Sequence, residues 1–143
     1  MQHQSFKTPA RDAVLVLAAG EEAIATLTRF AREQEIAGAT LTGIGAFEQA
    51  VLGYFDPQEQ DYLELPVSEQ TEVLALTGNI GRFEGAPRIH AHAVLGLRDG
   101  TTRGGHLVSG IVRPTLEVGL RIFPAPLPRQ TDAASGLALI RFA

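Results

Sequence analysis

The chain contains no cysteine. It therefore has no disulfide bond, no thiolate metal ligand and no cysteine nucleophile. Any metal ion that the chain binds must be held by nitrogen and oxygen ligands. The missing thiols also leave the redox compartment undetermined, because cysteine usage is the signal that would report it.

Long apolar runs and an excess of positive charge are missing as well. Residues 1–12 contain no apolar core of signal-peptide length, and no apolar run approaches the roughly 18 residues of a membrane span. The formal net charge of -4 gives no basic footprint for nonspecific contact with nucleic acid. We therefore predict a cytoplasmic bacterial or archaeal protein that acts on no membrane and does not bind DNA by itself.

The residues that are present have the composition of an ordinary globular protein. Of the 143 residues, 45% are hydrophobic and 20% are charged, which predicts a single domain spanning 1–143.

Ala13–Leu17 is a continuous apolar run, typical of a strand buried on both faces. Residues 24–31 carry apolar side chains at helical spacing, and Glu21 and Glu22 are expected in the first turn, where acids favour the helix dipole. The helix is expected to end within residues 34–38.

The rest of the chain predicts β-structure. The expected strands are residues 39–45, 46–56, 62–65, 72–80, 89–95, 106–112, 115–123 and 137–142. The proline-rich segment at residues 124–128 should be extended and lie along a surface or a neighbouring subunit, because repeated proline cannot donate to a sheet ladder. The predicted fold class is therefore α+β, a largely antiparallel β-sheet with one main helix near the N-terminus.

Three of the four histidines fall in two neighbouring apolar runs. His90 and His92 share one face of a strand because side chains alternate along it, and His106 begins the returning strand. A two-residue loop at Asp99-Gly100 would place His106 on the opposite face of the sheet. An odd loop, or a bulge at Gly104-Gly105, is therefore required to bring the three imidazoles together.

Such a cluster has two interpretations, which the sequence leaves open. Neutral imidazoles suit zinc, and a zinc site with three protein ligands leaves one position free for water or a small ligand. Alternatively, His90, His92 and His106 form a polar cluster that lines a subunit interface.

Glu72 lies within an apolar strand and is a candidate to accept a hydrogen bond from a metal-bound histidine, or to act as a base near the metal. Glu117 is interpreted as an outward-facing surface residue, since its strand alternates cleanly.

The order and spacing of six motifs resemble the PPC domain, the plant and prokaryote conserved domain. The motifs are Gly20-Glu21-Glu22, Ala39–Ala46, Gly53–Asp56, Glu72–Ile80, Ile89–His92 and Gly104–Leu107. The resemblance covers nearly the whole chain and implies an α+β domain that assembles as a homotrimer. It also implies that the clustered histidines are a metal site, as in prokaryotic members of the family.

The chain departs from the plant members of that family in the motif that contacts DNA. Arg-Gly-Arg-Pro, the AT-hook core with which the plant proteins contact the minor groove, is absent. The first hypothesis is therefore a trimeric regulatory module that binds a metal, for which zinc is the candidate, or an unknown small ligand or protein partner. The second is a small zinc enzyme that activates water at the histidine site. We expect the noncatalytic role, and the sequence names no substrate.

Overall fold

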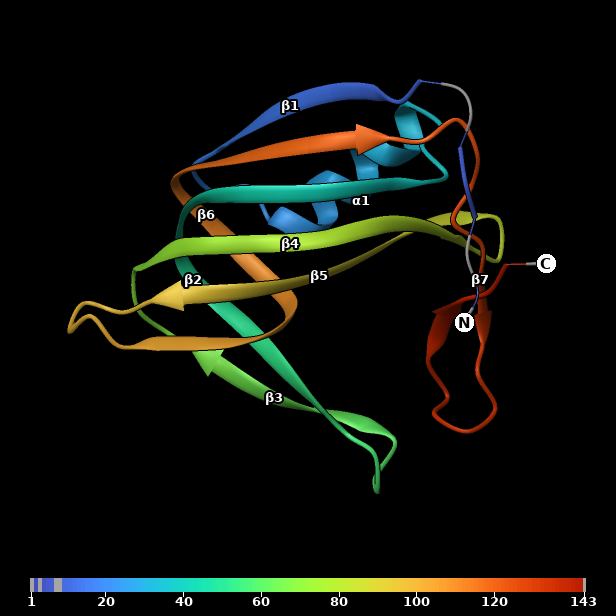
Figure 1. Cartoon of the computed structure of the whole chain (residues 1–143). Helices are drawn as coiled ribbons and strands as arrows, with labels where there is room; N and C mark the ends of the chain where they lie inside the picture. Colours follow the sequence, from blue (N-terminus) through green and yellow to red (C-terminus); the bar gives the residue numbers. More distant parts are fainter. Residues whose placement is uncertain (1, 3, 7–8, 143) are drawn as a thin grey trace.

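The computed structural model describes all residues except 1, 3, 7–8 and 143. Eight strands and one helix are found in the described part of the chain (Figure 1). Their bounds are β1 Arg11–Ala18, α1 Ala23–Glu33, β2 Ala39–Asp56, β3 Asp61–Val67, β4 Thr71–Phe83, β5 Ala86–Gly96, β6 Thr102–Ile122, β7 Arg129–Thr131 and β8 Ala138–Ile140. The predicted architecture, mostly antiparallel β-sheet with one short N-terminal helix, is confirmed.

The main sheet is built around two long strands. Its order is β1-β6-β5-β4-β2-β3, and a further pairing of β6 with β2 closes the strands β2, β4, β5 and β6 into a ring. β1 and β2 are both antiparallel to the second half of β6, so they run parallel to each other with α1 connecting them. Residues 102–106 at the start of β6 pair with β5, and residues 106–112 continue the pairing with β2, which brings the histidine hairpin into the ring.

The helix packs as its sequence predicts, but it begins after the two acids. The Glu22 carboxylate accepts hydrogen bonds from the backbone N–H groups of Ile24 and Ala25, so it satisfies donors that the first turn leaves free. Glu21 and Glu22 therefore precede the first turn, where Glu22 caps the helix, instead of lying within the turn as expected. The side chains of Ala23, Leu27 and Ala31 are fully buried against the sheet.

The prediction that β1 is buried on both faces was wrong. Val14 and Val16 are 77% and 69% exposed, while Leu17 faces the core. The reason is that α1 covers one side of the sheet only, so alternate residues of β1 point to the uncovered side. Val16 and Ile44 both pair with Glu117 in the sheet, and Leu74 lines the same shallow depression as Val14 and Ile44. We call Val14, Val16, Ile44 and Leu74 the apolar face.

Strands that were predicted as separate elements are continuous. Residues 39–45 and 46–56 form the single strand β2, and residues 106–112 and 115–122 belong to β6. Register shifts near Gly45 bend β2 without ending it. A Cβ at Gly45 would collide with the Thr115 carbonyl oxygen, and its φ of +153 is one that side chains disfavour. Glycine therefore marks a bend here, not a strand end.

The proline-rich segment lies along the surface of its own chain. Leu127 N donates to Ala37 O at 3.0 Å, and Arg82 N donates to Leu127 O at 2.9 Å. After this segment, β7 and β8 form a small separate hairpin. The predicted strand at residues 137–142 is confirmed in shorter form. No helix among the described residues is long and apolar enough to cross a membrane.

Candidate metal centre

The histidine hairpin has the odd loop that a three-imidazole cluster requires. β5 ends at Gly96 and β6 begins at Thr102, so five residues form the loop, which is closed by Leu97 N donating to Thr101 O at 2.8 Å. This loop places His92 directly opposite His106. The pairing between β5 and β6 is regular through Gly104 and Gly105, so no bulge is needed there.

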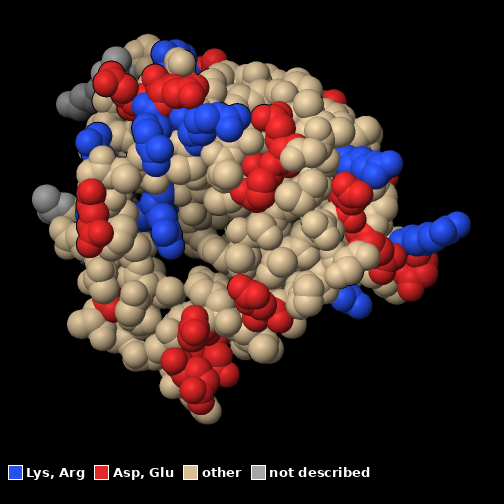
Figure 2. Space-filling model, turned by 180° about the vertical axis from the view of Figure 1, so that it is seen from behind, with Lys and Arg blue, Asp and Glu red and all other residues tan. Residues whose placement is uncertain are grey.

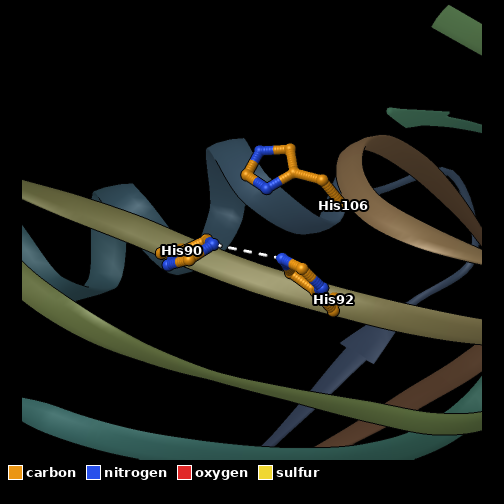
Figure 3. A group of neighbouring side chains, drawn as sticks. All are labelled: His90, His92 and His106. Carbon is orange, nitrogen blue, oxygen red and sulfur yellow. Dashed lines mark hydrogen bonds between the residues drawn. The ribbon is translucent and has the colours of Figure 1, made fainter. Parts of the chain in front are cut away.

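The three rings meet on the side of β5 that faces away from the helix (Figure 3). His90 Nε2 and His92 Nε2 are 3.1 Å apart, and the ring centroids of the three pairs lie 5.1, 5.3 and 5.6 Å apart. One nitrogen from each of His90, His92 and His106 lies within 4.8 Å of the other two. Sequence spacing and loop length together therefore assemble a cluster of three nitrogen donors.

The surroundings of the cluster keep two of its rings neutral. Burial, followed by the charge of Arg129 and contributions from His106, His92 and Arg88, lowers the pKa of His90 from 6.5 to about 4. Burial also lowers the pKa of His106, with His92 and Arg88 adding to the effect. A neutral imidazole has a free lone pair for a metal ion, whereas a protonated one has none. Both rings are therefore ready to act as ligands at neutral pH.

Two of the donor atoms have a spacing close to that of ligands in a tetrahedral zinc site. Tetrahedral zinc with Zn–N bonds near 2.0–2.1 Å separates its ligand nitrogens by roughly 3.3 Å, close to the separation of His90 and His92. His106 Nδ1 is buried and has no hydrogen-bond partner among the described residues, which is costly unless something binds it. Figure 3 shows a nitrogen of the His106 ring facing the other two rings.

The structure does not bring Glu72 to the histidines. Glu72 is exposed and pairs with Gly96 at the far end of β5, whereas Thr77 is the residue opposite His92. Five residues along β4 correspond to roughly 16 Å, which is too far for the Glu72 carboxylate to accept a hydrogen bond from a histidine ring. Glu117 is exposed on the outer side of the sheet, as expected.

Arg129 and Asn79 were not found by sequence reasoning. Asn79 lies opposite His90 in the pairing of β4 with β5, and its side-chain oxygen accepts a hydrogen bond from Arg129 Nη2. Strand alternation places Asn79 on the same face as Thr77, but the sequence pattern does not fix its register with His90. Arg129 lies beyond the proline-rich segment, and no pattern in the sequence connects it to the histidines.

The whole chain resembles solved structures of one family. Its residues 4–124 match the Plants and Prokaryotes Conserved (PCC) domain. The chain belongs to this family, also called PPC. A PPC protein from Pyrococcus horikoshii is 30% identical, with 100% of this chain and 99% of that chain covered and a TM-score of 0.91. The predicted family is therefore confirmed.

Two further solved structures are similar to this chain over nearly its whole length. A metal-containing protein from Archaeoglobus fulgidus is 31% identical, with 99% of this chain and 100% of that chain covered and a TM-score of 0.91. A protein from Bacteroides thetaiotaomicron, named provisionally as DNA-binding, is 27% identical, with 96% of each chain covered and a TM-score of 0.89. Among curated proteins, none matches this PPC chain.

Acid should destabilise the metal-free PPC chain through His90. Because the folded state holds the pKa of His90 near 4 and the unfolded state leaves it near 6.5, the unfolded chain binds more protons between these values. The free energy of unfolding therefore falls as pH drops from about 6.5 to about 4. The full pKa shift of His90 corresponds to about 3 kcal/mol in the free energy of unfolding. Because solvent partly screens the ring, we expect the free energy of unfolding to fall by about half of that.

Urea denaturation of metal-free protein at a series of pH values measures this loss. The His90→Asn variant should lose less stability than wild type over the same interval, because it removes the ring that resists protonation. Identical pH profiles for the two proteins would show that His90 does not carry the effect.

Proposed function

We propose that this PPC protein is a homotrimeric, noncatalytic module that binds one divalent metal ion per chain at His90, His92 and His106. The observation that carries the proposal is the cluster of three imidazole nitrogens within 4.8 Å of one another. Two of the three rings have lowered pKa values, so protons compete weakly for them at neutral pH. The role that we assign to the bound ion is regulation or the capture of a small ligand.

Zinc is the ion that these ligands suit best. Imidazole nitrogen binds zinc, copper, iron and nickel, and among these zinc accepts a tetrahedral set without redox chemistry. Three neutral ligands leave the full charge of the ion uncompensated and one coordination position open. The metal in the Archaeoglobus fulgidus relative supports a metal in this fold.

The apolar face supports assembly into a trimer. The side chains of Ile44 and Leu74 are 59% and 53% exposed, and with Val14 they line a depression of about 490 Å³. Apolar side chains that cluster on an open sheet face mark a surface for protein contact. Thr77 lines the same depression and pairs with His92, so an interface here would lie beside the histidines. The trimeric state itself follows from the family resemblance.

Direct binding to duplex DNA is not part of the proposed function. The net charge is -4, and the AT-hook core is absent. On the face shown in Figure 2, several basic side chains gather in one group that acidic side chains border, and the others lie apart from it, so the positive charges form no track across this face. A protein that follows the phosphate backbone needs such a track to release counterions.

A zinc enzyme remains the second candidate function. It is favoured by a pocket beside His90 and His106, which would give a small substrate access to the histidine cluster. Zinc-dependent turnover of a small ester, lost in a histidine variant, would establish this activity and replace the noncatalytic role.

Metal analysis of protein purified without a histidine tag tests the proposal. We expect about one zinc ion per chain, or stoichiometric uptake of added zinc after treatment with a chelator. The matched control is the His90→Asn, His106→Asn double variant, which should bind no zinc at this site. Wild-type protein that neither contains a metal nor takes up zinc, cobalt or nickel would refute the metal function.

A further inference from the structure

A small pocket adjoins the histidine cluster on the side of the C-terminal hairpin. Its volume is about 90 Å³, and its polar lining comes from Tyr62, Arg88, His90, His106 and Arg129, with Leu139 on the apolar side. We call it the arginine pocket. Its volume corresponds to about three water molecules, which is room for a very small organic molecule.

Arg129 is a buried charge that has no counterion among the described residues. The residue is only 8% exposed. Its Nη1 donates to Ala138 O at 2.6 Å and its Nη2 donates to Asn79 Oδ1, both of which are neutral acceptors. Its Nε has no partner, and no carboxylate of the described residues forms an ion pair with it. Burying a guanidinium is costly unless an anion pairs with it.

The remaining lining adds positive charge and no negative charge. Arg88 is exposed at the pocket and forms no ion pair within the described part of the chain. No aspartate or glutamate among the described residues lines the pocket. His90 and His106 belong both to the pocket and to the proposed metal centre, so a bound ion would place a further positive charge at the same wall.

We propose that the arginine pocket binds a small carboxylate, with Arg129 and Arg88 as its charge partners. The planar guanidinium matches the two oxygens of a carboxylate, and Leu139 offers an apolar contact to a short carbon chain. A carboxylate that carries a neighbouring hydroxyl or keto group can also reach the metal. That second contact rests on the proposed metal function, whereas the arginine contacts do not.

Glycolate, a small 2-hydroxy acid, is the probe that tests this site. Its binding is measured by nuclear magnetic resonance titration of metal-free and zinc-loaded protein, with the arginine Nε–H signals as one readout. We expect Arg88→Gln to weaken glycolate binding about tenfold, because a charged hydrogen bond is lost. Arg88 is exposed, so this variant should fold normally. Arg129→Lys should weaken binding further, because lysine keeps the charge but loses the planar pair of donors.

Arg98→Gln is the matched control, because it removes the same charge from an exposed residue of the hairpin loop outside the pocket. It should leave glycolate affinity unchanged. Glycolate binding to metal-free protein that depends on Arg88 would support the pocket even if the chain bound no metal. Binding that Arg88→Gln and Arg129→Lys both leave unchanged, or no binding in either metal state, would overturn the proposal. Tighter binding of inorganic phosphate than of glycolate would overturn the assignment to carboxylates.

Discussion

Replacing His92 with alanine should lower the zinc affinity of this chain at least about a hundredfold. Loss of a partner that only orients a metal ligand costs roughly 10–100-fold in affinity, so loss of a ligand should reach or exceed the upper end of that range. The fold should persist because the His92 side chain is exposed, while Ala91 and Ala93 on either side of it face the core. Isothermal titration with zinc measures the affinity, and circular dichroism checks the fold.

His3→Ala is the control for this experiment, because it removes a histidine that the sequence places far from the other three. His3 lies outside the described residues, and the sequence interpretation gives it no ligand role. The zinc affinity of this variant should equal that of wild type. Equal affinity of wild type and His92→Ala would mean that zinc binds elsewhere, and the cluster would then be interpreted as a polar lining of an interface.

Replacing Val14 with arginine should convert the proposed trimer into monomers. Val14 is 77% exposed in the single chain, so arginine can be accommodated without disturbing the core. In a trimer that buries the apolar face, each subunit of the variant would place an unpaired arginine charge in the interface. Burying such a charge costs on the order of several kcal/mol. Sedimentation velocity at micromolar concentration should show a trimer for wild type and a monomer for the variant.

Leu63→Arg is the matched control for the assembly experiment. Leu63 is 60% exposed on β3, and strand alternation places it on the same side as Leu65, which pairs with the core residue Leu52. It therefore lies on the opposite side of the sheet from the apolar face. The variant should remain trimeric. A wild-type monomer, or a trimer that survives Val14→Arg, would exclude the apolar face as the trimer interface.

The sequence by itself determined the features that depend on local spacing. The period of two placed His90 and His92 on one strand face. Hairpin register required either an odd loop or a bulge, and the structure contains the odd loop. The helix at residues 23–33 followed from its apolar stripe, although its acids precede the first turn. These predictions hold because strand alternation, helical periodicity and hairpin register are properties of neighbouring residues.

Only the tertiary structure decided which faces are covered and which distant residues meet. Ala13–Leu17 has the pattern of a fully buried strand, yet the one helix covers a single side of the sheet and leaves Val14 and Val16 exposed. Arg129 reaches the histidines because the chain folds back after residues 124–128 and places β7 beside β4. Glu72 is separated from them by its register with Gly96. Burial and long-range pairing depend on how whole elements pack, which no local pattern encodes.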